Sequence, residues 1–436
     1  MQITNIRRSQ VLHIAWPIIL SNLSTPLLGL VDTAVIGNLG DASLLGAIAI
    51  GALIFSFIYW GFGFLRMGTT ALVAQAAGAN HQKEASAVFY RAAMIGAAIG
   101  LILITIQIPI AFAAFELLSG SAAVEEAAHA YFSIRIMGAP FSLALLAVMG
   151  YLLGVQATRT VLLLNIILNG LNIVLDLVFV VGFGWGVEGV ALATVIAEIT
   201  ALTAGAIVLL PRLRAAGIVP AKVILRPAEL RRMLVVNRDI MIRTLCLIFA
   251  FAWFTNEGAS QGDITLAANA ILMQFVAFAA FFLDGFALAA ESLIGAAVGA
   301  RNHTRIKQSI RYIFEWGIVT ALALSGLFWL SGGWIIDLLT NVEAVRESTR
   351  SFLWWAVLAP VISVWCYLLD GIFIGATRTP QMRNAMIVSL IAFLGLWWIA
   401  VPPLGNHGLW LALHGYFVAR ALSLAYYLPP IMRELR

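Results

Sequence analysis

Long hydrophobic runs, separated by short polar segments, fill the whole chain. Because about 20 apolar residues span the hydrocarbon core of a bilayer, runs of this length predict membrane-crossing α-helices. Twelve such runs lie at about 12–38, 43–76, 85–115, 126–155, 158–182, 187–211, 237–258, 264–299, 306–332, 345–375, 381–402 and 406–430. The pattern therefore predicts an all-α, polytopic membrane protein with twelve transmembrane helices, several of them tilted or extending beyond the bilayer.

The composition supports this class. Hydrophobic residues make up 62% of the 436 residues and charged residues only 11%, whereas soluble domains carry about 25% charged residues. The two cysteines, Cys246 and Cys366, lie inside apolar runs, which favours a packing role. The sequence shows no metal-ligand cluster, nucleotide-binding motif or nucleophile–base arrangement. We therefore expect neither an enzyme nor a bound cofactor.

The basic residues predict the orientation in the membrane. They gather before the first run and in the connections at 83–91, 159, 212–238, 301–311 and 378–383. The other connections are nearly free of them, with Arg346 and Arg350 as exceptions. Because basic loops stay on the cytoplasmic side, both termini are expected there, in a multi-pass protein of the cell inner membrane. The net charge of +5 follows from these loops and does not indicate nucleic-acid binding.

The two halves of the chain resemble each other. QATRT at 156–160 matches GATRT at 375–379, and GVEGVALA at 186–193 matches GNHGLWLA at 405–412, so both matches share the offset 219. LVAQAAGA at 72–79 matches LIGAAVGA at 293–300. The repeat predicts two pseudo-symmetric six-helix bundles: an N-terminal lobe at 1–211, a basic cytoplasmic linker at 212–236 and a C-terminal lobe at 237–436. Rocking of such parallel repeats is one route to alternating access.

One predicted helix carries a polar stripe. Asn165, Asn169, Asn172 and Asp176 follow the spacing i, i+4, i+7, i+11, which places them on one face. Such a face is not expected to meet lipid, and an ionisable residue at membrane depth indicates a functional site. At the 219 offset Asn165 corresponds to Asn384, while the other three have no polar counterpart. We therefore assign Asn165 to helix packing and the rest to a specialised site.

A second carboxylate, Asp32, lies in the first run, and the repeat equates it with Phe254. Two carboxylates close together at low dielectric do not both ionise cheaply, so one is expected to hold a proton. We predict Asp32 as the principal protonation site and Asp176 as its partner.

A family resemblance carries the interpretation further. PLLGLVDTAVIGNLG and NIVLDLVFVVGFGWGVEGVALATVIAE resemble segments of the multidrug and toxic compound extrusion (MATE) transporters. FLRMGTTALVAQAAGA, VNRDIMIR, LLDGFALAAE and WCYLLDGIFIGATRT resemble the DinF-like branch of that family. The resemblance implies a MATE-like fold, a monomer, and antiport of drug-like, often cationic compounds against inward H⁺ or Na⁺.

The resemblance also implies an ion-coupling site in the N-terminal lobe, formed by Asp32, Tyr131, Asn172, Asp176 and Thr194. Further candidates for a polar substrate cavity are Asn169, Asp284, Asp370 and Arg66; the two aspartates would pair with Arg66 or Arg420. Arg243 is expected to snorkel to the interface. No structural metal site is predicted, although oxygens of Asp32, Asn172, Asp176 and Thr194 would also suit Na⁺.

Three alternatives remain open at this stage. Na⁺ coupling uses the same oxygen ligands, and we favour H⁺ over it. A lipid or lipid-linked oligosaccharide flippase of the same superfamily would need several basic residues in its cleft, and the predicted spans hold few. A membrane-embedded enzyme would need clustered catalytic groups, whereas the histidines are scattered along the chain.

Overall fold

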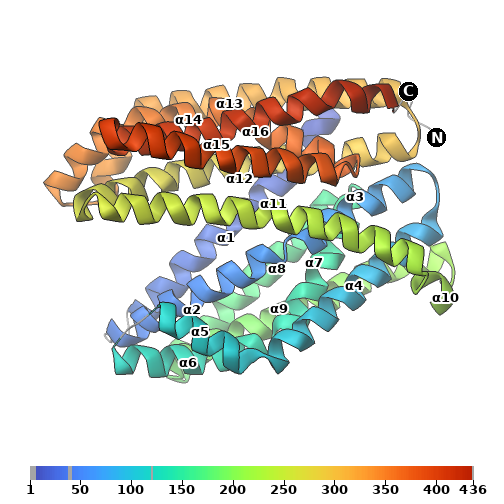
Figure 1. Ribbon diagram of the computed structural model, residues 1–436. Helices are drawn as coiled ribbons and strands as arrows, with labels where there is room; N and C mark the ends of the chain where they lie inside the picture. The colour runs from blue at the N-terminus through green and yellow to red at the C-terminus, as the bar shows by residue number, and fades with distance from the viewer. Residues whose placement is uncertain (1–5, 38–41, 119–120, 435–436) are drawn as a thin grey trace. The chain divides into compact units, whose positions relative to one another are not determined.

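The computed structural model describes residues 6–37, 42–118 and 121–434, and within these ranges every regular element is helical. The elements are α1 (Arg8–Gly37), α2 (Ala42–Gly61), α3 (Phe64–Gly78), α4 (Gln82–Thr105), α5 (Gln107–Leu117), α6 (Ala122–Ile136), α7 (Ala139–Gly154), α8 (Thr158–Asp176), the π-helix η1 (Leu177–Gly182), α9 (Gly186–Ala216), α10 (Ala221–Ile224), α11 (Pro227–Ser260), α12 (Asp263–Gly299), α13 (His303–Leu339), α14 (Glu343–Gly375), α15 (Thr379–Leu404) and α16 (Asn406–Glu434) (Figure 1). The chain ends, for which a cytoplasmic location is predicted, lie outside the described residues.

The all-α prediction with twelve spans is confirmed, because each predicted run corresponds to one helix or to two consecutive helices. In the described part of the chain, nine segments are long and apolar enough to cross a membrane, and α6 with α7 forms a tenth that is bent by 53°. The bend falls at Gly138, and Pro140 occupies the first turn of α7. Proline fits there because the first helical turn leaves its N–H groups unbonded, so the chain restarts as a helix in a new direction.

The chain divides into two compact units. The N-unit comprises residues 20–234, and the C-unit comprises residues 1–19 together with 235–436. The contacts therefore group the start of the chain, through Ile19, with its second half. The segment predicted as a linker, 212–236, is largely helical: α9 continues to Ala216, α10 occupies Ala221–Ile224 and α11 begins at Pro227.

Arg91 anchors α10 within the N-unit. Its Nε donates to the carbonyl of Ile224 at 2.8 Å and its Nη2 to that of Val223 at 2.8 Å. Its Nη1 donates to Glu84 at 2.7 Å. A cation at the end of a helix satisfies carbonyls that have no partner inside it, so a single buried arginine fixes this short element.

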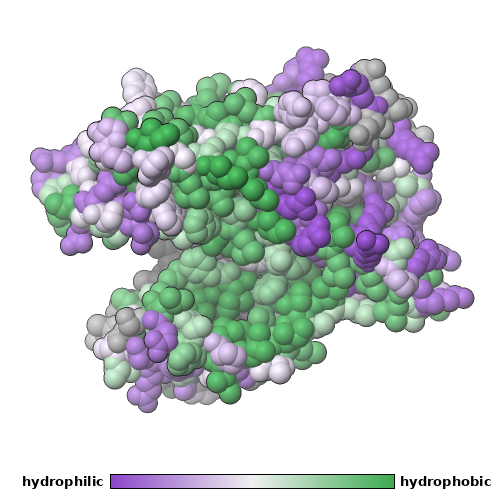
Figure 2. Space-filling model, viewed as in Figure 1, coloured by the Kyte–Doolittle hydropathy of each residue, from purple (hydrophilic) through white to green (hydrophobic). Residues whose placement is uncertain are grey.

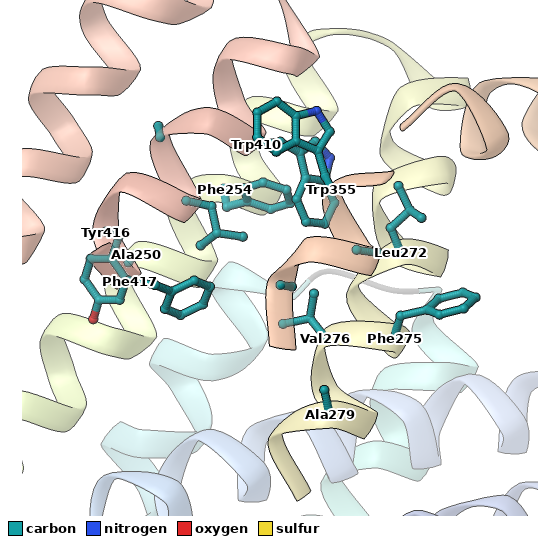
Figure 3. Close-up of a cluster of buried hydrophobic side chains, with 14 of the residues drawn as sticks. Ala250, Phe254, Leu272, Phe275, Val276, Ala279, Trp355, Trp410, Tyr416 and Phe417 are labelled. Atoms are coloured by element: carbon teal, nitrogen blue, oxygen red, sulfur yellow. The ribbon is translucent and has the colours of Figure 1, made fainter. Parts of the chain in front are cut away.

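The surface and the core of each unit have the residue composition expected of a membrane protein. Figure 2 shows hydrophobic residues along the flanks of both units and hydrophilic residues gathered toward their ends. Inside the C-unit, large aromatic side chains form a core that includes Phe254, Trp355, Trp410, Tyr416 and Phe417 (Figure 3). Phe254 meets Trp410 edge-on, with ring centroids 5.0 Å apart, which is a favoured geometry for aromatic pairs.

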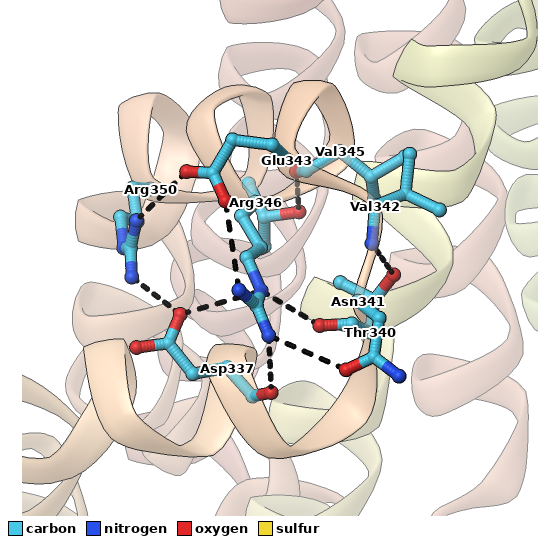
Figure 4. A network of polar contacts seen from close by, with 9 residues as sticks. Asp337, Thr340, Asn341, Val342, Glu343, Val345, Arg346 and Arg350 are labelled. Carbon is cyan, nitrogen blue, oxygen red and sulfur yellow. Dashed lines mark hydrogen bonds and ion pairs between the residues drawn. The ribbon is translucent and has the colours of Figure 1, made fainter.

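Arg346 and Arg350, the exceptions to the basic-loop pattern, belong to a polar network between α13 and α14 (Figure 4). Arg346 donates to the carbonyls of Thr340 at 2.7 Å and Asp337 at 3.0 Å, and so caps the end of α13. Arg350 pairs with Asp337, and Arg346 lies 3.5 Å from Glu343. Asp337 and Glu343 thus offset the positive charges of Arg346 and Arg350. This pairing explains why two arginines occur in a connection that otherwise has few basic residues.

The two units repeat the same close helix contacts. Four glycines each pack against a backbone carbonyl of a neighbouring helix, where a Cβ atom would overlap the oxygen. They form two pairs of equivalent contacts, and the members of each pair differ by 221 in residue number: Gly150 on Arg66 with Gly371 on Ala287, and Gly154 on Thr70 with Gly375 on Glu291. Because both partners of each contact shift by the same number, the register of the repeat through these helices is 221.

Left-handed turns give the same register. Asn80 follows α3 and Arg301 follows α12, with φ of 59° and 50°; Gln156 follows α7 and Thr377 follows α14, with φ of 61° and 54°. The members of each pair differ by 221 in residue number. The equivalence of QATRT and GATRT at 219 is therefore wrong by two residues at the start of α8. The 219 offset holds only farther on, where Gly186 and Gly405 have φ of 56° and 53°.

The difference of two residues is taken up between these points. In the N-unit α8 continues as η1, with six π-helical residues from Leu177 to Gly182, whereas α15 is α-helical over its full length. A π-turn accommodates additional residues within a continuous helix and is frequent at functional sites. Asp176 is the last residue before it.

Candidate functional site

The polar stripe of α8 lies against a matching stripe on α1. Asn165 Nδ2 donates to Ser21 Oγ, and Asn169 Nδ2 donates to Ser24 Oγ at 2.7 Å. Asp32 follows Ser21 by eleven residues, so it lies on the same face of α1. The two serines were not predicted as part of the site, although their spacing from Asp32 is the signal that would have indicated them.

Asp32 and Asp176 meet where the two stripes end. Their carboxyl groups lie close enough to act on each other electrostatically, and Asp176 is 0% exposed. Among the described residues, no nitrogen or hydroxyl donor hydrogen-bonds to either oxygen of Asp176 or to Oδ1 of Asp32. An ionised carboxylate only accepts hydrogen bonds, so a bond between these two carboxyls would require a proton on one of them. The geometry suits a pair that shares one proton or holds a cation.

Asn172 and Thr194 extend this site to α9. Asn172, which is 1% exposed, donates from Nδ2 to Thr194 Oγ1 at 3.2 Å, and Thr194 donates to the carbonyl of Val190 at 2.9 Å. Asn172 Oδ1 has no donor within the described part of the chain. A buried acceptor without a donor costs about 1–3 kcal/mol. Several such oxygens, gathered one turn apart on α8, indicate a site whose acceptors are satisfied by a proton or a small cation.

Tyr131 on α6 is buried beside the same group. Its ring lies on Gly51, where a Cβ atom would overlap it, and meets Phe55 edge-on at 6.2 Å. Asp32 and Arg135 act on its phenol electrostatically. Five residues expected in the ion-coupling site, together with Asn169, therefore lie within one unit.

A buried ion pair next to these residues was missed as a site. Arg135 Nη1 and Nη2 bind the two carboxylate oxygens of Glu198 at 2.9 and 2.6 Å, and Ser142 Oγ also donates to Glu198. The guanidinium lies 5.2 Å from the ring centroids of both Phe55 and Tyr59. Two parallel bonds and two aromatic faces hold the arginine in place.

Arg135 also acts on the carboxylate pair. It follows Tyr131 by four residues on α6, so the two share a face, and its positive charge acts on Asp32. Sequence spacing did not reveal the ion pair, because its members are 63 residues apart and either could have been a solvated end charge.

In the C-unit, Asp370 is held by two arginines. Arg243 donates to it from Nε at 2.9 Å and Nη2 at 2.6 Å, and Arg420 donates from Nε at 3.2 Å and also from Nη2. The pairing of Asp370 with Arg420 agrees with the expectation. The expectation that Arg243 snorkels is wrong, because its guanidinium is buried and bound to Asp370.

Two further candidates for a polar cavity are charged residues of α3 and α12. Arg66 is half-buried on α3, and Asp284 is half-buried on α12, where it acts electrostatically on Tyr367. No group of three or more His, Cys, Asp or Glu side chains suited to a metal ion occurs among the described residues.

The corrected register changes the comparison between the halves. At an offset of 221, the four stripe positions of α8 correspond to apolar residues in the C-unit core: Met386, Leu390, Phe393 and Trp397. Asn165 therefore has no polar counterpart: its equivalent is Met386, and Asn384, on which its assignment to packing rested, occupies a different position. The whole stripe is specific to the N-unit.

The chain matches known proteins along most of its length. The MatE family model matches residues 17–178 and 240–399. The chain is 42% identical to the DNA damage-inducible protein F of Escherichia coli (strain K12) over 416 residues, 95% of this chain and 90% of that protein. It is 23% identical to a probable multidrug resistance protein NorM of Acinetobacter baylyi, over 93% of this chain and 92% of that protein.

Solved structures share the fold. A MOP superfamily transporter from Pyrococcus furiosus superposes with a TM-score of 0.89 at 20% identity, covering 97% of this chain and 96% of the other. An outward-facing multidrug resistance MATE family transporter gives 0.89 at 19% identity, covering 98% and 96%. Both likenesses agree with two six-helix bundles.

Proposed function

This chain belongs to the MatE family of membrane transporters, and on that premise we propose that it exports drug-like, often cationic compounds in exchange for inward H⁺. It would work by alternating access as a monomer in the inner membrane, with both termini in the cytoplasm. The observation that supports the proton coupling is the proximity of Asp32 and Asp176, together with the lack of a donor to either oxygen of Asp176 or to Oδ1 of Asp32 in the described chain.

The pair would couple the two fluxes through charge. At an effective dielectric constant of about 20, two carboxylates about 4 Å apart repel each other by about 4 kcal/mol, so a proton on one of them relieves a large repulsion. A cation near the pair relieves the same repulsion, and the two ligands therefore compete. Proton arrival from outside would displace a cationic substrate, and proton loss to the cytoplasm would restore affinity for the next one.

Asn172, Thr194 and Tyr131 would support this exchange. Asn172 presents its unused oxygen one turn before Asp176, while its amide is oriented by Thr194. The buried ring of Tyr131 on α6 would help to exclude water from the site.

A second candidate function is Na⁺-coupled antiport. Carboxylate, amide and hydroxyl oxygens are hard ligands for such a cation, and the acceptors of Asp32, Asn172 and Asp176 without a donor favour it specifically. A flippase is less well supported, since the four fully buried arginines of the described chain are each engaged by a carboxylate: Arg91 by Glu84, Arg135 by Glu198, and Arg243 and Arg420 by Asp370.

The test is ethidium transport into or out of proteoliposomes under an imposed pH gradient or an imposed Na⁺ gradient. We expect transport under the pH gradient alone, and its loss in Asp32→Asn and Asp176→Asn at equal reconstitution. Asp337→Asn, which removes a half-exposed carboxylate of the α13–α14 network, is the matched control and should transport normally. Transport only with Na⁺ would replace the proton in this proposal, and full activity of Asp32→Asn would refute it.

A further inference from the structure

A buried histidine in the C-unit faces two carbonyl oxygens. His414 on α16 is 3% exposed. Its Nδ1 lies 3.0 Å from the carbonyl oxygen of Trp410 on the same helix, and its Nε2 lies 3.1 Å from that of Trp355 on α14. Both separations are hydrogen-bond distances.

A neutral imidazole does not satisfy this arrangement. It carries one N–H, so in either tautomer the other nitrogen turns a lone pair toward a carbonyl lone pair. Only the doubly protonated ring donates to both oxygens. The geometry is therefore complete with one additional proton and incomplete without it.

The surroundings of the ring also favour a cation. Its centroid lies 5.1 Å from that of Trp355, 6.1 Å from that of Trp410 and 6.4 Å from that of Phe417, three aromatic side chains of the core in Figure 3. Aromatic faces attract cations, most strongly where water is excluded. Burial opposes the charge. A proton held by carbonyls and rings, with no carboxylate to trap it, would be bound and then released.

No other charge competes for the ring within the described chain, since its polar neighbours are the two carbonyls. Several titratable side chains on α14, α15 and α16 have partners of their own: Arg350 with Asp337, Asp370 with Arg243 and Arg420, Arg383 with Asp239, and His407 with Trp355.

The site lies near an exposed histidine. His407, in the first turn of α16, is exposed and accepts a hydrogen bond from Trp355 Nε1 at 3.1 Å. One exposed and one buried imidazole thus lie against the same indole, and His414 is about 11 Å farther along the helix at 1.5 Å per residue. The N-unit has Val195 at the equivalent position, so the histidine is specific to the C-unit.

We propose that His414 is a second proton-binding site, separate from the carboxylate pair. The proton enters from the end of α16 at which His407 lies and binds the unprotonated ring nitrogen. The imidazolium then links the carbonyls of Trp410 and Trp355 and ties α16 to α14. Loss of the proton leaves a single hydrogen bond and weakens that tie.

The test uses full-length protein in which the other five histidines are replaced by glutamine (His13, His81, His129, His303 and His407, all exposed or half-buried), so that His414 is the sole histidine. With ¹⁵N-labelled histidine, the ring nitrogens are followed by NMR from about pH 8 to about pH 5, the range in which histidines titrate. We expect both nitrogens to reach imidazolium shifts. A single neutral tautomer over the whole range would overturn the proposal.

Two further variants separate this site from the carboxylate pair. Adding Asp32→Asn to the sole-histidine protein should abolish driven export and leave the His414 titration in place. In the otherwise native chain, His414→Gln should lower the number of protons taken up per substrate exported by about one while export continues. An unchanged ratio in His414→Gln would contradict the proposal, whatever the outcome for Asp32→Asn.

Discussion

Trp397 packs edge-on against Trp253, with ring centroids 5.1 Å apart and planes at 87°. At the offset of 221, Trp397 corresponds to Asp176. The same offset applied to α1 and α11 makes Trp253 the counterpart of Asp32, whereas the repeat read from the sequence had given Phe254, one residue later. The same place in the two repeats thus holds a carboxyl pair in one unit and an indole pair in the other. A six-helix bundle of this kind does not need the carboxyls in order to fold.

The first prediction contrasts two buried aspartates. Asp176→Asn should leave the free energy of unfolding within about 1 kcal/mol of the wild type, because no donor loses its partner. Asp370→Asn should lower it by about 3–5 kcal/mol, since it leaves Arg243 and Arg420 buried without a carboxylate. Unfolding in detergent, followed by tryptophan fluorescence, measures both. Equal losses of stability would assign Asp176 to structure.

The second prediction concerns Arg135 and Glu198. Each single glutamine substitution should cost about 3–5 kcal/mol, whereas the double variant, Arg135→Gln with Glu198→Gln, should be close to the wild type, because no charge is left unpaired. The sum of the single effects should exceed the double effect by several kcal/mol in a denaturation cycle. Additive losses would mean that the two side chains do not act as a pair.

The same Arg135 and Glu198 variants also differ in the pH dependence of transport. Glu198→Gln leaves the positive charge of Arg135 uncompensated near Asp32, and a nearby cation favours the ionised carboxylate. Half-maximal export should then require a more acidic outside than in the wild type, while the double variant loses this shift. An unchanged pH dependence in a folded Glu198→Gln protein would separate the ion pair from proton coupling.

The third prediction tests the repeat contact between α12 and α14. A methyl group at Gly375 would lie 2.5 Å from the carbonyl oxygen of Glu291, so Gly375→Ala should destabilise the protein by about 1–3 kcal/mol. Gly395→Ala is the matched control inside α15, where no atom lies within 4 Å, and it should stabilise by up to about 1 kcal/mol. Thermal melting of purified protein separates the two, and a neutral Gly375→Ala would argue against the close contact.

The sequence predicted the helices well because each transmembrane segment needs a long apolar run, which is a local property of the chain. The register of the repeat was misjudged for a physical reason. GATRT resembles QATRT letter by letter, but the left-handed turns at Gln156 and Thr377 place the structural match two residues away. The π-helix η1 accommodates the two additional residues of the N-unit, and no sequence identity between the halves marks its position.

The ion pairs escaped prediction for a different reason. Asp370 and Arg243 are 127 residues apart, and Glu198 and Arg135 are 63 apart. Helical periodicity states which face a charge occupies, but it does not state which distant face it will meet. The Asp32–Asp176 pair could be predicted from the sequence because both residues interrupt apolar runs and lack counterparts in the second half.

The last prediction divides the polar stripe into a packing part and a coupling part. Asn169→Leu introduces the residue found at the equivalent C-unit position, Leu390, and removes the hydrogen bond to Ser24. It should lower the free energy of unfolding by about 0.6 kcal/mol, the average for hydrogen bonds between membrane helices, and should keep gradient-driven export. Asn172→Leu should abolish export while remaining folded, since it removes the acceptor next to Asp176. Ethidium efflux and melting of both variants measure the boundary. Loss of export in Asn169→Leu would extend the coupling site along α8, and retention in Asn172→Leu would confine it to the two carboxyls.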